Sequence, residues 1–331
     1  MFLLVCLACV QHYKYPLVMS NANITSQDIT KTHRRILMEL QQLRYFLAVV
    51  EEKNITRAAR ILRISQPALS RQLQRLEDEL NGVLFDRTPS GIILTENGYY
   101  LAERAREMVT LADKIVTNLT TEETLHGDLY IGGGETTSML SVIRAFHEMH
   151  QQHPEVTIRI HSGNGQDILD KLDKGILDFG LVIEPFDVKE YHHLQLATAD
   201  RWGILTRRDH PLGQQTTVDA ADLRNAPLII SEQTKDQQQF AEKTGLDFNA
   251  SRIVGTYNLL FNASLLVKEG LGHALCLDHI INTTGSELIF VPLLPNVTSN
   301  TFLIWKKEAV LSRPAKKLLE WLRHSQNETA L

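Results

Sequence analysis

The segment between residues 53 and 75 is the part of this sequence best suited to hold a ligand by charge and hydrogen bonding. Its six cationic residues are Lys53, Arg57, Arg60, Arg63, Arg71 and Arg75, and no acidic residue lies among them. The whole chain, in contrast, has a formal net charge of −5. A basic segment in an acidic protein is typical of a local contact with DNA phosphates, although charge alone fits a solvated pair of helices equally well.

Apolar residues at helical spacing place this basic segment on short helices. Positions 40, 43, 46, 47 and 50 predict a first helix near 39–52, and Asn54 and Thr56 can cap a second helix over 56–62. Ser65 can cap a third helix with Pro67 in its first turn, and Asn81-Gly82 can end it. This spacing predicts a helix-turn-helix, whose third helix fits the major groove of DNA.

The predicted third helix has one apolar face and one face of hydrogen-bonding side chains. Gln66 can bond adenine from the first turn, Arg71 can bond guanine, and Ser70 can bond a base or a phosphate. Other polar residues nearby are suited to hold phosphates. The candidate DNA-binding residues are Thr56, Arg57, Ser65, Gln66, Pro67, Ser70, Arg71, Gln74, Arg75 and Arg87.

Two short apolar runs at 83–85 and 92–94 predict a β-wing, and Thr95 can cap a helix that continues to about residue 119. Apolar residues on this helix step by four and three in alternation, the pattern that pairs helices into coiled coils. The alternative is a single helix whose apolar residues pack into the core of the same chain. Polar and charged residues fill most positions between the apolar ones, which favours the coiled coil. The candidate dimer seam is Leu101, Ala105, Met108, Ala112, Ile115 and Leu119.

Beyond a hinge at 120–127, predicted strands alternate with predicted helices. Strands at 128–131, 156–161 and 178–183 predict a parallel βαβαβ unit, and a second series of similar elements follows. Two such lobes usually hold a small molecule in the cleft between them. We expect a winged helix-turn-helix at 38–95, a linker helix at 96–124, and a two-lobed domain at 125–331, with the first lobe near 125–198 and 273–331 and the second near 199–272.

The segment Ser-Gln-Pro-Ala-Leu-Ser-Arg-Gln-Leu at 65–73 resembles the recognition helix of LysR-type transcriptional regulators. Further segments at 43–52, 56–59, 84–88, 94–98 and 267–275 are similar to stretches of that family, and only 1–37 lies outside the resemblance. It implies an α+β multidomain fold: winged helix-turn-helix, linker helix and a two-lobed α/β effector domain of the type-2 periplasmic-binding-protein kind. It also implies a homotetramer, a dimer of dimers, that binds double-stranded DNA and a small-molecule co-inducer. RNA polymerase is a further candidate partner.

The same resemblance places the effector site at strand ends that face the cleft. Hydroxyls and backbone N–H groups after the first strand favour an anion or a carboxylate there, although each hydroxyl can equally well cap a helix. Glu135, Glu184 and Glu232, if they line the pocket, favour instead an effector with amine or hydroxyl groups. The candidate effector-binding residues are Glu135, Thr136, Thr137, Ser138, Ser162, Gly163, Asn164, Ile183, Glu184, Ser231, Thr234 and Asn262.

No motif in the sequence indicates catalysis. The chain has no GxSxG, HExxH or GK[ST] segment. His147, His150 and His153 are spaced by three, but the third drifts around the helix, which predicts surface positions rather than a metal site. We therefore expect a regulator without enzyme activity, cofactor or metal. An enzyme recruited to DNA is the alternative, and it would need an activated nucleophile or a metal site.

The first ten residues are apolar, but they are fewer than the ~20 that span a membrane. They lack the basic start and the clear cleavage site of an export signal, so we interpret 1–37 as a disordered leader from a start assigned too early, with Met38 as the natural start. Cys6, Cys9 and Cys276 offer no disulfide framework. We expect a cytoplasmic protein without membrane contact. An exported solute-binding protein is the alternative, but it has no use for the helix at 65–77.

Overall fold

The computed structural model describes residues 38–88, 91–119, 124–184, 186, 189–235, 238–248 and 250–329. The leader interpreted at 1–37 lies outside the described residues. The chain divides into two compact units, Met1–Ala105 and Arg106–Leu331, and the boundary falls inside the long helix α5 (Glu96–Leu119).

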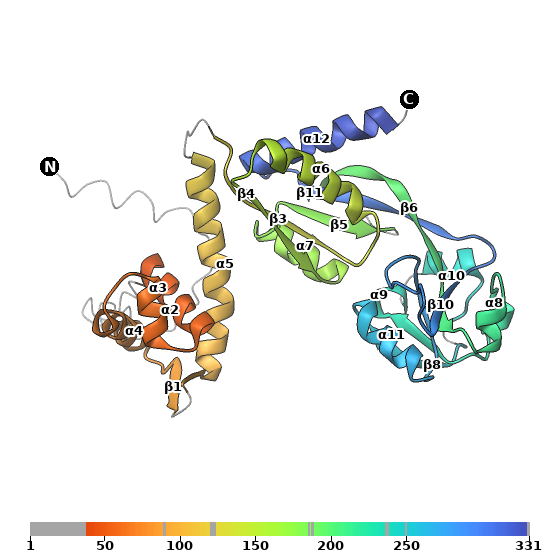
Figure 1. The fold of residues 1–331 in the computed structure, drawn as a ribbon, viewed down its shortest axis with the longest axis horizontal. Coiled ribbons are helices and arrows are strands. Elements are labelled where there is room, and N and C mark those ends of the chain that lie inside the picture. Colours follow the sequence, from red (N-terminus) through yellow and green to blue (C-terminus); the bar gives the residue numbers. More distant parts are fainter. Residues whose placement is uncertain are drawn as a thin grey trace, which may run out of the picture. The chain divides into compact units, whose positions relative to one another are not determined.

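The first unit has the three predicted helices, α2 (Leu40–Glu52), α3 (Ile55–Ile61) and α4 (Gln66–Leu80) (Figure 1). The Asn54 side chain accepts a hydrogen bond from the backbone N–H three residues on, at 3.0 Å, and Ser65 does the same at 3.3 Å. Asn81, with φ of 50°, ends α4 in the left-handed conformation that this residue type tolerates. Phe46 and Leu69 are fully buried between the helices. Local capping and helical spacing therefore explain these three elements.

A two-stranded wing, β1 (Phe85–Thr88) and β2 (Gly91–Leu94), follows α4. Its entry is tied to α4 by Glu77, whose Oε1 accepts hydrogen bonds from the backbone N–H groups of Leu84 at 2.7 Å and Phe85 at 3.3 Å. At its exit, Thr95 Oγ1 accepts a hydrogen bond from Gly98 N at 3.1 Å and caps α5. These side chains hold the wing against the end of α4.

The described strands of the second unit form one nine-stranded sheet that passes through two lobes (Figure 1). Two long strands, β6 (Tyr191–Arg207) and β11 (Thr298–Lys306), run antiparallel and contribute to the join between the lobes. The first lobe adds β3 (Gly127–Gly133), β4 (Val156–Ser162) and β5 (Phe179–Ile183). The second adds β7 (Leu228–Ser231), β8 (Ile253–Tyr257), β9 (His273–Leu277) and β10 (Leu288–Pro292).

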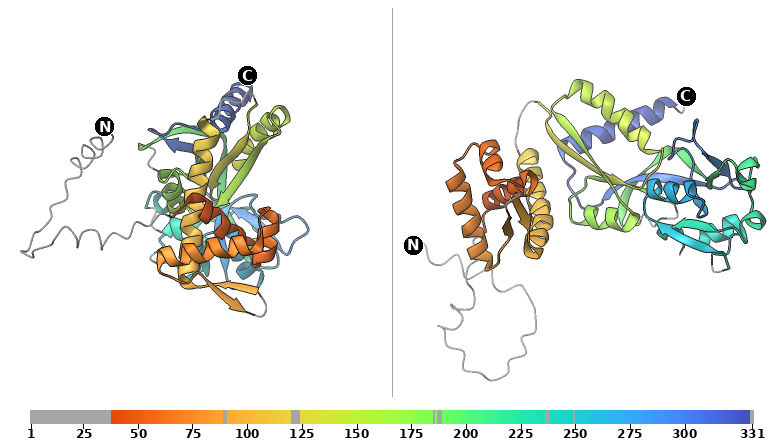
Figure 2. Two further views of the ribbon diagram at one scale, coloured as in Figure 1. Left: turned by 90° about the vertical axis from the view of Figure 1, so that its left-hand side faces the viewer. Right: turned by 60° about the horizontal axis from the view of Figure 1, so that its bottom comes forward.

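Helices cover both faces of the sheet in each lobe. In the first lobe, α6 (Met139–Gln152) and α12 (Arg313–Thr329) pack side by side on one face, and α7 (Gly165–Asp173) covers the other (Figures 1 and 2). In the second lobe, α10 (Gln238–Thr244) and the short α8 (Ala220–Leu223) lie on the face opposite α11 (Leu260–Lys268). The short η1 (Pro211–Gln214) and α9 (Glu232–Lys235) complete the lobe.

The predicted parallel βαβαβ unit is confirmed, since β3 pairs in parallel with both β4 and β5. Two features of the second unit differ from the expectation. The sheet as a whole is mixed, because β11 runs antiparallel to both β5 and β6, and β10 runs antiparallel to β6. The chain also stays in the second lobe beyond residue 272. β9 pairs with β7 and with Trp202–Leu205 of β6, so the return to the first lobe comes only with β11. Strand pairing between distant segments decides both points, and periodicity within one segment carries no signal for it.

Candidate functional site

The exposed face of α4 carries the side chains that the sequence singled out. Gln66, Arg71, Gln74 and Arg75 are exposed, as are the capping Ser65 and Pro67, whereas Ser70 is half-buried. Gln66 Nε2 donates a hydrogen bond to Ser70 Oγ at 2.8 Å, so the two side chains lie together at the start of the helix. The arrangement presents amide, hydroxyl and guanidinium groups on one side of a helix of 15 residues. A helix face of this chemistry can bond both base edges and phosphates.

Several of these groups already have partners on the protein surface. Arg75 Nε lies 2.9 Å from Glu79 Oε1, and Gln74 Nε2 donates to Asp78 Oδ1 at 3.2 Å. Arg57, on α3, lies 3.5 Å from Glu52. Exposed pairs of this kind contribute little stability, so a phosphate can replace the carboxylate at small cost. Thr56 is exposed on the same helix, and Arg87 belongs to β1, although its side chain lies outside the description.

Apolar side chains form an exposed stripe along α5. Met108, Ile115 and Leu119 are 44%, 59% and 77% exposed, and Leu101 and Ala112 are half-buried. Ala105 is fully buried, so its place in the predicted seam was wrong: the side chain is already covered within the chain. Leu111 and Val116, which do not belong to the predicted seam, are exposed beside it and widen the stripe.

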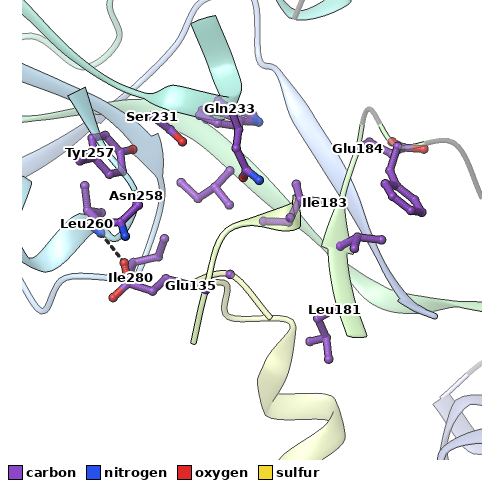
Figure 3. A pocket seen from close by; sticks show the side chains of 17 residues that line it. Glu135, Leu181, Ile183, Glu184, Ser231, Gln233, Tyr257, Asn258, Leu260 and Ile280 are labelled. Atoms are coloured by element: carbon purple, nitrogen blue, oxygen red, sulfur yellow. Dashed lines mark hydrogen bonds between the residues drawn. The ribbon is translucent and has the colours of Figure 1, made fainter. Parts of the chain in front are cut away.

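A cleft of about 160 Å³ opens between the two lobes of the second unit (Figure 3). Of the predicted effector residues, five line it: Glu135, Gly163, Ile183, Glu184 and Ser231. Other described residues also line the cleft, and most of them could not be singled out from the sequence: Gly134, Gly165, Leu181, Val182, Phe186, Trp202, Gln233, Tyr257, Asn258, Leu260, Leu277 and Ile280. Tyr257 and Asn258 stand at the carboxyl end of β8, so the rule that strand ends face the cleft would have found them. The apolar residues carry no comparable signal.

Three predicted effector hydroxyls do not line the cleft, because a buried carboxylate takes them. Thr136 Oγ1 and Ser138 Oγ donate to Asp200 Oδ2 at 2.6 and 3.0 Å, and Thr137 Oγ1 donates to Asp200 Oδ1 at 3.0 Å. Thr301 Oγ1, from β11, adds a fourth hydrogen bond at 2.8 Å to Oδ2. Asp200 lies on β6 and is only 3% exposed. The hydroxyls thus join the first lobe to the two strands that lead into the second.

The remaining predicted effector residues whose side chains are described are not among those that line the cleft. Ser162, Asn262 and Glu232 are exposed and do not line it. Asn164 Oδ1 accepts a hydrogen bond from Asp167 N at 2.9 Å and caps α7. Thr234 belongs to α9, but its side chain lies outside the description.

Two glutamates bring negative charge to the cleft. Glu135 Oε2 accepts a hydrogen bond from the backbone N–H of Leu260, the first residue of α11, and so connects the lobes (Figure 3). Glu184 Oε2 accepts from Asn300 N at 3.2 Å and Asn300 Nδ2 at 3.0 Å. On the second lobe, Tyr257 donates its hydroxyl to Leu275 O at 2.7 Å, and burial raises the pKa of this phenol well above its usual value. The Tyr257 hydroxyl therefore stays protonated.

Within the described part of the chain, no three His, Cys, Asp or Glu side chains gather as a metal site would need. Nor does any helix of that part have the length and apolar character required to cross a bilayer.

A small winged helix-turn-helix with an exposed polar recognition face, joined to a two-lobed domain with a cleft, defines a DNA-binding regulator. Two family models match. Residues 40–99 match the bacterial regulatory helix-turn-helix protein of the lysR family, and 122–327 match the LysR substrate binding domain. The chain therefore belongs to the LysR family of DNA-binding transcriptional regulators, as the sequence predicted, and it is not an enzyme.

Individual relatives agree with this assignment. The transcriptional regulator BudR of Raoultella terrigena is 28% identical over 86% of this chain and 99% of its own length. The dual regulator OxyR of Escherichia coli K12 is 29% identical over 59% of this chain and 64% of its own. The crystal structure of CbnR has a TM-score of 0.63 at 21% identity, covers 87% of this chain and 99% of that one, and supports the fold.

Proposed function

We propose that this protein is a sequence-specific regulator that reads DNA with α4 and is controlled by a small molecule bound in the cleft of the second unit. The observation that carries the first part is the exposed face of Gln66, Arg71, Gln74 and Arg75 on a capped helix. The observation behind the second is the cleft, whose walls come from both lobes and combine apolar side chains with few polar groups, as ligand sites do.

We assign different roles to the candidate DNA residues. Gln66 and Arg71 lie near the helix start and are proposed to read base edges, with Ser70 holding Gln66 in place. Thr56, Arg57 and Arg87 are proposed to hold phosphates, which fixes the position of α4 on the duplex without selecting a sequence. One such module binds weakly, so two modules on a shared DNA site are expected.

A second copy of the chain would bring two modules together. The exposed stripe on α5 can pair with the same stripe of another copy as a coiled coil. The second unit has two further exposed apolar sets. Leu140, Ile143 and Ile160 lie on α6 and β4, and Phe261 and Leu265 lie on α11. The stripe on α5 and these two sets support more than one self-association surface and hence a dimer of dimers, which works in the cytoplasm and can engage RNA polymerase at the promoter.

Binding to the DNA upstream of the protein's own coding region tests the proposal. In a gel shift, Gln66→Ala and Arg71→Ala should each lose about 1–3 kcal/mol of discrimination between specific and random DNA. Arg323→Ala, an exposed change on α12, should leave binding unchanged. Equal losses on specific and random DNA would limit both residues to phosphate contacts. A metabolite that raises the melting temperature and alters the shift would support control by the cleft.

A further inference from the structure

We infer that the cleft selects uncharged or cationic effectors, because two of the chain's own carboxylates take the donor groups that were expected to hold a carboxylate of the ligand. Asp200 binds the hydroxyls of residues 136–138, which are thereby kept out of the cleft lining, and Glu135 accepts from the start of α11 at the cleft itself. This inference rests on the proposed function, since it concerns the same cleft and names the class of molecule that it accepts.

Asp200 fills a cradle of hydroxyl groups. Four hydroxyls donate to its carboxylate, three of them from the consecutive residues 136–138 after β3 and one from β11. Hydroxyls that converge in this way after a strand would suit a bound carboxylate, because each supplies one donor to an anion removed from water. Here the anion belongs to β6, and it is buried. A carboxylate ligand finds these donors already used.

Glu135 fills the second position, the start of α11. The first N–H groups of a helix have no partner within the helix, and the helix dipole makes this end attractive to anions. Leu259 precedes the helix and offers no side-chain cap. The Glu135 carboxylate comes from the opposite lobe and accepts the hydrogen bond from Leu260 N instead (Figure 3). A second anion placed at this helix end would meet the charge of Glu135.

The remaining lining fits the same class of ligand. None of the described residues that line the cleft is Lys, Arg or His, whereas Glu135 and Glu184 both are acidic. Ser231, Gln233 and Asn258 supply neutral hydrogen-bonding groups from the second lobe, and apolar side chains form much of the rest. The volume of about 160 Å³ is close to the ~150 Å³ of an apolar cavity that holds benzene. The fitting effector is therefore about one ring in size, with a hydroxyl, amide or ammonium head.

Chemical rescue tests the assignment. In the full chain, Asp200→Ala removes the carboxylate and leaves the four hydroxyls, so sodium formate should refill the cradle. We expect formate to raise the melting temperature of this variant by ~2–4 °C over equal sodium chloride, and to leave the wild type unchanged. Formamide, a neutral molecule of similar shape, should have less effect. A wild type stabilised by formate to the same extent would overturn the inference, as would a variant that does not respond.

A second variant and a larger probe cover the case in which Asp200→Ala does not fold. Glu135→Ala frees the start of α11, and formate should stabilise it in the same assay. Benzoate is the single-ring carboxylate probe: saturable stabilisation of the wild type by benzoate would refute the exclusion of carboxylates. DNA binding is measured separately. If formate stabilises the variants but does not alter their gel shift, the carboxylate assignment stands and the proposed control of DNA binding by the cleft fails.

Discussion

The ammonium group of Lys114 on α5 lies 3.2 Å from Asp178 Oδ1, and the two side chains are only 13% and 6% exposed. Lys114 Nζ also donates to the carbonyl oxygens of Gly175 at 3.1 Å and Ile176 at 2.8 Å. Asp178 directly precedes β5, whose other end lines the cleft through Ile183. This buried pair therefore connects the linker helix to a strand that reaches the cleft.

Burial acts on both members of this pair in the direction that opposes ionisation. It lowers the pKa of Lys114 and raises the pKa of Asp178, because the loss of hydration outweighs the attraction between the two groups. The pair is therefore a device for fixing geometry more than a source of net stability, since removing one member leaves a buried charge without its partner.

Lys114→Met is expected to lower the free energy of unfolding by about 3–5 kcal/mol at neutral pH, because Asp178 is left buried and unpaired. Urea denaturation measures the change. Lys174→Met is the matched control: Lys174 lies 3.3 Å from Glu107 in a more exposed pair, and its loss should cost about 0–1 kcal/mol. Equal losses in the two variants would contradict the role given to burial.

The cost of Lys114→Met should also shrink in acid. Burial raises the pKa of Asp178 in the folded wild type, whereas the charge and the hydrogen bond of Lys114 lower it. Without Lys114 the folded pKa of Asp178 should rise further, so the folded variant should hold this proton more tightly than the folded wild type does. The stabilising effect of protonation is present below the unfolded pKa and is lost as the pH rises through the folded pKa. Denaturation at several pH values should show the variant approach the wild type as the pH falls. A difference that is constant with pH would exclude protonation of Asp178.

His273 should lower the stability of the second unit in acid. Burial, and to a lesser extent His210 with its ring 4.4 Å away, lowers the pKa of His273 to about 4 from 6.5. The unfolded state then binds the proton first, so the stability is complete above pH 6.5 and is lost as the pH falls toward 4. The loss between pH 7.5 and pH 5 should be about 2 kcal/mol.

Thermal melts of the wild type and His273→Asn over this pH range measure the effect. The asparagine keeps a polar group beside Thr206 Oγ1, which is hydrogen-bonded to His273 Nδ1 at 2.7 Å. The variant should lose about 2 kcal/mol less stability on acidification than the wild type. His147→Asn, an exposed change on α6, should retain the pH dependence of the wild type. Parallel curves for the wild type and His273→Asn would show that His273 does not titrate as described.

Glu77→Ala should destabilise the first unit by about 1–3 kcal/mol and weaken DNA binding. The change leaves the N–H groups of Leu84 and Phe85 without the carboxylate that now accepts from both, and it unties the wing from α4. Asp78→Ala removes the neighbouring exposed carboxylate and should stay within about 0.5 kcal/mol. Unchanged stability in Glu77→Ala would show that water replaces the carboxylate at no cost.

Ile115→Glu should weaken self-association through the exposed stripe of α5. The change places a charge where a partner helix would bury an apolar side chain, which corresponds to a loss in affinity of about tenfold to a hundredfold. Sedimentation velocity over a range of concentrations measures it. Arg106→Glu also introduces a glutamate, but on the opposite side of α5, and should leave association unchanged. Equal dissociation in both variants would point to a general effect of charge.

Local signals account for what was predicted correctly. The caps Asn54 and Ser65, the left-handed Asn81 and the helical spacing of apolar residues all act within one or two turns of chain, and the first unit follows them. The exposed polar face of α4 could be predicted because a helix period assigns each residue to one side. Residues at strand ends were assigned to the cleft from the resemblance to the LysR family, and five of the predicted effector residues do line it.

Contacts between distant segments account for the features that were not predicted from the sequence. Asp200 meets hydroxyls more than 60 residues earlier in the chain, and Glu135 meets Leu260 across 125 residues. β9 stays in the second lobe through its pairing with β6 and β7. Residue types indicate which groups can form hydrogen bonds, and the periodicity of the sequence indicates on which side of a helix or strand they lie. Which distant partner they meet depends on packing and strand pairing, and that packing turned three expected ligand-binding hydroxyls into the internal partners of a buried carboxylate.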